Sequence, residues 1–150
     1  MSFTGADVSA QTVTYWTAEG EHSPSWSTLP FTGASVVEAL KHPKETANKT
    51  IFVREFEASQ YDIVKELERQ QGVTYKAETI DAAAAIKEAK RKVAESNDVY
   101  AKYVLVQAGF LRPEYKTDFV KAKEYVVTDL LGLPTSTLQT VVKDALKQYA

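Results

Sequence analysis

The sequence predicts an α/β domain of the α+β kind, built from a small mixed sheet with a β-hairpin and about five helices. Short stretches rich in β-branched and aromatic residues alternate with longer stretches whose apolar residues recur every three or four positions. The first pattern predicts strands and the second predicts amphipathic helices. The chain has 150 residues, a length typical of one domain, so we expect residues 1–150 to form a single domain.

Four stretches are predicted to be strands. Residues 11–17 and 25–31 flank a turn that contains Gly20, and together they predict the hairpin. Residues 50–55 carry a run of isoleucine, phenylalanine and valine, and residues 73–80 alternate apolar and polar side chains. These last two stretches are expected to complete the sheet.

The predicted helices cover residues 32–41, residues 60–71, the stretch between Asp81 and Asn97, residues 99–111 and residues 135–149. Several of their ends carry recognisable signals. Ser59 with Asp62 has the spacing of an N-terminal cap, and Gly72 suits the residue after a helix. Asp81 and Asp98 are expected to cap the two helices that follow them. Pro43 is expected to end the first helix, because the residue before a proline avoids the helical region.

The C-terminal third of the sequence yields three further expectations. The helix over residues 99–111 has a broad apolar face, so we expect it to be the most buried helix. Residues 112–127 show no clean period and are expected to form a long loop. Ser136 and Gln139 have the spacing of a capping box for the last helix.

Composition excludes several classes of protein. Eighteen basic residues against 20 acidic ones give a net charge of −2, so no basic excess indicates nucleic-acid binding. No apolar run approaches the roughly 18 residues of a membrane span, and the N-terminus lacks the pattern of a secretory signal. The chain contains no cysteine, which excludes disulfides, thiol nucleophiles and cysteine-bound metals. We expect a cytoplasmic protein without a membrane or nucleic-acid partner.

Motifs for catalysis and cofactor binding are absent from the sequence. The two histidines, His22 and His42, stand alone and are interpreted as surface residues, so no metal is expected. The glycines are too widely spaced to form a phosphate-binding loop, and we therefore expect no nucleotide cofactor in this chain. The acidic pairs, including Glu55 with Glu57, are interpreted as solvated. Whether the protein is an enzyme stays open.

Aromatic residues make up 11 % of the chain and supply the candidate binding residues. We predict that Phe3, Phe110, Tyr115 and Phe119 line a cleft for a small apolar molecule, because aromatic side chains commonly form such clefts. The alternative is that the loop over residues 112–127 folds onto the core and its aromatic residues hold it there.

Four stretches together resemble one protein family. They are TVTYWTAEG at residues 12–20, FTGASVVEALKHPKETANKTIFV at residues 31–53, FEASQYDIVKEL at residues 56–67 and LLGLP at residues 130–134. In this order and spacing they resemble the C-terminal half of NmrA-like and isoflavone-reductase-like proteins, which are atypical short-chain dehydrogenases.

The resemblance implies a particular part of that family's structure. Full-length members carry an N-terminal Rossmann half that binds NADPH, and the matching residues of this chain correspond to the smaller, substrate-side half. A cofactor is therefore implied only for full-length relatives. We expect a free-standing substrate-side domain that binds a small apolar molecule or a protein partner, without hydride transfer of its own.

Other functions remain open beside this binding module. The chain could be part of an NAD(P)H-dependent oxidoreductase that resembles isoflavone reductase, or a small biosynthetic enzyme that uses the same cleft. A third possibility follows from regulatory relatives, which act as redox-sensing partners of transcription factors. Fold resemblance alone does not choose among these functions.

A homodimer is also expected. If the half that would cover this domain is absent, apolar surface faces water, and such surface usually marks an interaction site. The predicted hairpin has an open edge, so Trp16 or Trp26 is expected to lie partly buried between two copies.

Overall fold

The computed structural model describes residues 4–147 and confirms the α+β class. The strands are β1 (Ala6–Asp7), β2 (Thr12–Tyr15), β3 (Ser25–Trp26), β4 (Phe56–Glu57) and β5 (Lys76–Thr79). The α-helices are α1 (Leu29–Lys41), α2 (Pro43–Thr46), α3 (Gln60–Gln71), α4 (Ala82–Ser96), α5 (Val99–Leu111) and α6 (Leu138–Leu146). Short 3₁₀ turns cover Ala18–Gly20 and Pro113–Tyr115. None of these helices has the length and apolar character needed to cross a membrane.

The strands form two small sheets. In the first, β2 lies between β1 and β5, antiparallel to β1 and parallel to β5, with Val13 opposite both Ala6 and Ala77. In the second, β3 pairs antiparallel with β4, so that Trp26 lies opposite Phe56. Phe119, which lies in the loop after α5, is held against this second sheet because its N–H donates to Ser25 Oγ at 3.1 Å.

The predicted hairpin of residues 11–17 and 25–31 is wrong. Its first strand pairs with β1 and β5, and its second pairs with β4, thirty residues further along the chain. The second stretch is also cut short, because Thr28 caps α1 and Pro30 occupies its first turn, where proline is well tolerated. Phe31 is consequently buried in a helix instead of a strand.

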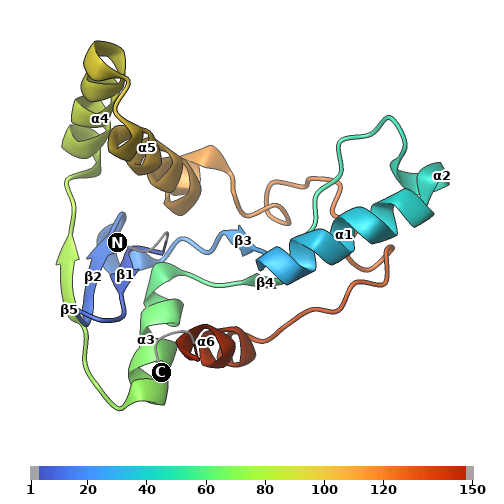
Figure 1. The fold of residues 1–150 in the computed structure, drawn as a ribbon, viewed down its shortest axis with the longest axis horizontal. Coiled ribbons are helices and arrows are strands. Elements are labelled where there is room, and N and C mark those ends of the chain that lie inside the picture. The colour runs from blue at the N-terminus through green and yellow to red at the C-terminus, as the bar shows by residue number, and fades with distance from the viewer. Residues whose placement is uncertain (1–3, 148–150) are drawn as a thin grey trace.

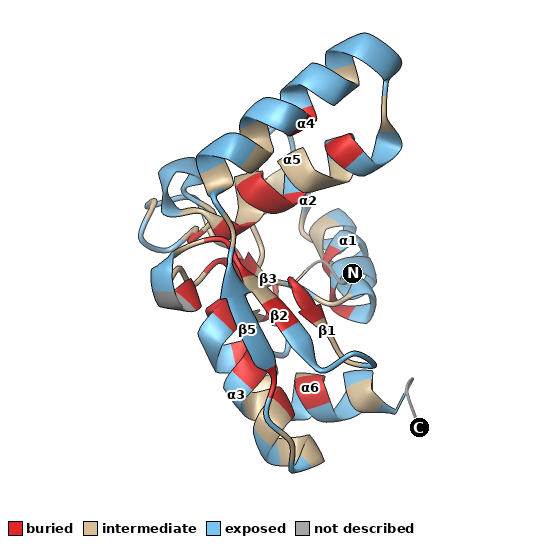
Figure 2. Ribbon diagram, turned by 90° about the vertical axis from the view of Figure 1, so that its left-hand side faces the viewer, coloured by how far each residue is buried: buried red, intermediate tan, exposed pale blue. Residues whose placement is uncertain are grey.

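The helices surround the sheets unevenly (Figure 1). Helices α3 and α6 pack on each other below the three-stranded sheet, and α4 and α5 form a helical hairpin that rises above it. Helix α1 leads away from β3 and, with α2, forms an arm at the right of Figure 1. Figure 2 shows that buried residues gather along the sheet, α3 and the inner side of α5, while most of α4 is exposed.

The buried apolar residues of the described chain form three clusters instead of one continuous core. The first joins β1, β2 and β5 to α3 and α6, and the second joins α1 to the segments around residues 51–53 and 127–133. The third packs Trp16 against Ala108 and Leu111 of α5. The side chain of Trp26 contacts both the first and the third cluster, so it connects them.

Most predicted helix ends are confirmed. Ser59 and Asp62 form a reciprocal capping box at the start of α3, and Gly72 ends the helix in the left-handed conformation. Asp81 caps α4 and Asp98 caps α5. These signals are local, so the residues that carry them are enough to place the helices.

Three other predictions are corrected. Thr137, not Ser136, caps α6, and no capping box with Gln139 forms. Residues 50–55 contain only an isolated bridge from Phe52 to Val126 instead of a strand. Helix α5 has four buried residues, as many as α3, but its predicted apolar face is partly in solvent, because Val99 and Tyr100 are exposed.

Gln60 is the polar residue on which the packing of the first sheet depends. Its side chain is 1 % exposed, and its Oε1 accepts a hydrogen bond from the backbone N–H of Trp16 at 3.0 Å. Its amide donates to the carbonyl oxygens of Thr4 at 2.7 Å and Thr14 at 3.0 Å. Gly5 makes this approach possible: a Cβ there would lie 2.6 Å from Gln60 Nε2, and its φ of +82° also favours glycine.

Replacing Gln60 by methionine is expected to lower the free energy of unfolding by about 3 kcal/mol, because one buried and two partly buried backbone groups lose this partner. Methionine has nearly the same length and shape, so little of the loss comes from volume. Urea denaturation measures the effect. Gln139→Met, at an exposed position of α6, is the control and is expected to change stability by less than about 0.5 kcal/mol. Equal effects of the two substitutions would contradict this role for Gln60.

Candidate functional site

Trp26 forms one wall of the candidate site. Its ring stacks on Phe56 with centroids 6.4 Å apart and meets Phe110 edge-on at 4.7 Å. Its indole Nε1–H donates to the carbonyl oxygen of Ala58 at 2.8 Å. The strand pairing of β3 with β4 places the ring, and the two aromatic contacts and the hydrogen bond then fix its orientation.

An apolar cavity of about 280 Å³ lies between this aromatic wall, β1, α3 and α6. Its main lining side chains are Ala6, Trp26, Phe56, Ile63, Leu67 and Val142. The volume is near the lower end of the range of small-molecule sites, about 300–1,000 Å³. An apolar cavity half this size holds a benzene molecule, so this one has room for a small apolar ligand.

A more polar hollow of about 450 Å³ adjoins the apolar cavity. The two share Thr28, Val141 and Ala145 as lining residues. The polar hollow is also lined by Glu55 and Ser136. The site therefore has an apolar part and, next to it, a part with a carboxylate and hydroxyl groups.

Glu55 is the one charged residue of this site that is almost fully buried, with 7 % exposure. Its Oε2 accepts hydrogen bonds from the Thr28 N–H at 2.8 Å and the Thr28 hydroxyl at 2.7 Å. Its Oε1 accepts from the Ser136 hydroxyl at 2.5 Å. Thr28 is the N-cap of α1 and Ser136 precedes the N-cap of α6, so the carboxylate lies beside the starts of two helices, where negative charge is favoured.

Two effects oppose each other in the pKa of Glu55. Burial disfavours the charged form and would raise the pKa, whereas the hydrogen bonds from Ser136 and Thr28 favour the charged form and lower it. The hydrogen bonds prevail, and the pKa lies below the ordinary value of 4.5. Glu55 is therefore an anion at neutral pH.

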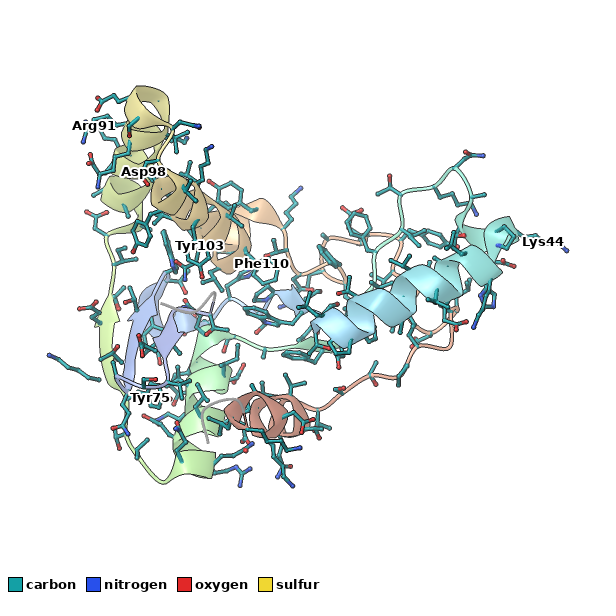
Figure 3. All side chains as sticks on the ribbon, viewed as in Figure 1. Lys44, Tyr75, Arg91, Asp98, Tyr103 and Phe110 are labelled. Atoms are coloured by element: carbon teal, nitrogen blue, oxygen red, sulfur yellow. The ribbon has the colours of Figure 1, made fainter. Side chains whose placement is uncertain are left out.

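Of the predicted cleft residues, the three that lie within residues 4–147 line neither the apolar cavity nor the polar hollow. Phe110 meets the Trp26 ring edge-on within the protein, and Figure 3 shows it at the end of α5 beside β3. Phe119 packs on Phe52 with centroids 4.8 Å apart, and Tyr115 is 53 % exposed. Phe3 lies outside the described residues. The contact of Phe119 favours the alternative in which loop aromatic residues hold the loop in place.

The polar residues of the site were not expected from the sequence. Glu55 and Glu57 were both predicted to be solvated, but only Glu57 is exposed, where it pairs with Arg54 at 3.0 Å. Ser136 was predicted to cap a helix, whereas its hydroxyl donates a hydrogen bond to Glu55. The local signal for both was weak, because the partners of Glu55 lie 27 and 81 residues away.

The two histidines are half-buried and lie outside this site. His22 Nε2 is 2.8 Å from the Thr117 hydroxyl oxygen, and His42 Nδ1 is 2.9 Å from the carbonyl oxygen of Glu38. Burial lowers the pKa of His22. The His22 ring therefore contacts the loop after α5, and the His42 ring contacts the last turn of α1.

Comparisons of the chain with protein-family models, with curated proteins and with solved structures find no match. The resemblance to NmrA-like proteins thus stays a prediction from the four sequence stretches, and a function can be inferred only from the geometry of the site.

The stability that Glu55 contributes is expected to depend on pH. Because its pKa is lower in the folded chain, the contribution is fully present above about pH 4.5 and is lost as the pH falls through the folded pKa. Glu55→Gln should cost about 2 kcal/mol at neutral pH and progressively less toward about pH 3, measured by urea denaturation at each pH. Glu57→Gln is the control. A cost for Glu55→Gln that stays constant over this range would show that the carboxylate charge is not what stabilises the junction.

Proposed function

We propose that this protein is a binding module that holds a small apolar molecule in the cavity between α3, α6 and the β3–β4 sheet. The apolar lining of the 280 Å³ cavity is the observation that carries the proposal. Other hollows are less suited to such a ligand: the one beside β2, β5 and α3 is wider, at about 860 Å³, but is lined mainly by charged and hydroxyl-bearing side chains.

The proposal agrees with the substrate-side role that the resemblance to NmrA-like proteins implies. It differs in the residues that bind, because the cavity uses Trp26, Phe56 and Val142 in place of the loop aromatic residues. If the chain is instead part of an NAD(P)H-dependent oxidoreductase or a small biosynthetic enzyme, the same cavity is the place for the substrate. Addition of NADPH and turnover of a bound candidate would then distinguish an enzyme from a binding module.

Filling the cavity is expected to weaken binding of toluene, a neutral apolar probe. Ala145 lies on the exposed side of α6 and lines both hollows, so leucine there adds three carbon atoms toward the site. We expect Ala145→Leu to weaken toluene binding at least tenfold with little change in melting temperature. NMR titration that follows the methyl groups of Ile63 and Val142 measures the affinity.

Ala94→Leu, at an exposed position of α4 away from the site, is the matched control and should leave toluene binding unchanged. The proposal fails if the unmodified protein gives no saturable shift of these methyl groups, or if Ala145→Leu binds toluene as well as the unmodified protein does.

A protein partner is a second candidate, and helix α1 supplies the observation that favours it. One side of α1 buries Phe31, while another exposes Leu29 (88 %) and Leu40 (77 %) together with Val36 and Val37. A helix that is apolar on two sides is normally covered on both. We propose that this exposed side of α1 is where a second copy or another protein binds.

This surface replaces the one expected from the sequence. Trp16 is 4 % exposed within a single chain, and Trp26 is partly buried against Phe56 and Phe110. If the expected homodimer forms, α1 is therefore a better contact than the β2 and β3 segments.

For the homodimer, analytical ultracentrifugation at micromolar concentration is expected to give about twice 16.7 kDa, and Leu40→Glu should shift the protein to the monomer. Val99→Glu places the same charge on an exposed valine of α5 and is expected to leave the dimer intact. A monomer in the unmodified protein, or a dimer that survives Leu40→Glu, would rule out this contact between copies.

A further inference from the structure

The carboxylate of Glu55 has an unfilled hydrogen-bonding position. A carboxylate offers about four acceptor positions, and Thr28 and Ser136 fill three of them. Oε2 accepts two of these bonds and Oε1 accepts one, so the free position belongs to Oε1. Among residues 4–147, no lysine, arginine or histidine forms an ion pair with this carboxylate.

The two helix starts stabilise the negative charge of Glu55 but do not neutralise it. Each helix end contributes only a partial positive charge, about half an elementary charge. A buried carboxylate normally has a full cationic partner, because taking it out of water is costly otherwise. The polar hollow gives such a partner access to Glu55, since Glu55 is one of its lining residues.

We propose that the site takes an apolar amine, whose protonated amino group binds Glu55 while its apolar body lies in the adjoining cavity. This inference rests on the proposed function and names the class of ligand. Thr28, Val141 and Ala145 line both hollows, so the two hollows are neighbours, and the proposed ligand would reach from one into the other.

The other chemistry of the hollow favours an amine over an acid or an alcohol. Asp144 adds a second carboxylate to the lining, so an anionic head group would be repelled. An alcohol would fill the free position but leave the buried charge uncompensated. An ammonium group carries three donors, and the hydroxyl oxygens of Ser136 and Thr140 in the same hollow can accept those that Glu55 does not.

Two probes of matched shape test the inference: 3-phenylpropylamine, which is protonated at neutral pH, and 3-phenylpropanol, which is neutral. Isothermal titration is expected to show at least tenfold tighter binding of the amine to the unmodified protein. Glu55→Gln should reduce this preference to less than threefold. Glu57→Gln is the control: this carboxylate lines neither hollow and pairs with Arg54 at 3.0 Å, so the preference should change less than threefold.

The outcomes separate the inference from the proposed function. Binding of toluene and of the alcohol, without any advantage for the amine, overturns the amine proposal and leaves the apolar site intact. Absence of binding by all three probes overturns both. If Glu55→Gln does not fold, the ¹³Cδ resonance of Glu55 in the unmodified protein decides. A shift with the amine but not with the alcohol supports the proposal, and a resonance that neither probe moves overturns it.

Discussion

The hydrogen bonds of Glu55 hold together three segments that are distant in the sequence. Its side chain binds Thr28 at the start of α1 and Ser136 just before α6, and its backbone N–H donates to the carbonyl oxygen of Trp26 at 2.8 Å. One residue thus fixes where α1 leaves the second sheet and where the last segment of the chain returns to it. The cost of burying a charge is offset by donors from two helix starts, and those donors are in place only when all three segments meet.

The cavity is a consequence of the same junction. Because Ser136 is held at Glu55, α6 lies across the open side of α3 and the β3–β4 sheet, where Val142 joins the first cluster. Small side chains such as Ala6 and Ala145 do not fill the space that remains. Glu55 therefore both holds these segments together and lines the polar hollow, so the proposed binding site would be coupled to the stability of the fold.

The sequence predicted those features that depend on neighbouring residues. The capping box of Ser59 and Asp62, the left-handed Gly72 and the caps Asp81 and Asp98 each act within a few residues, and all four are present. The predicted β-hairpin is wrong because the pairing of a strand depends on contacts with residues from the whole chain. Two short stretches next to each other in sequence each found a more distant partner.

The candidate site was hard to predict for the same reason. Glu55 is one acidic residue among 20, and only the approach of Thr28 and Ser136 distinguishes it from Glu57 two positions later. Phe110 and Phe119 each contact another aromatic ring within the protein, which satisfies the tendency of such side chains to leave water without a ligand.

The division of the core into three clusters has a consequence for how the molecule opens. The α4–α5 hairpin is anchored through the cluster around Trp16, and the edge contact between Phe110 and Trp26 links it to the rest. Unfolding of this hairpin would break one cluster and leave the packing of α3 against α6 in place. Amide protons of α4 and α5 should then exchange with solvent through local opening, at a lower free energy than those of α3. The hairpin would behave as a separate cooperative unit, which meets the wall of the proposed binding cavity at the indole ring of Trp26.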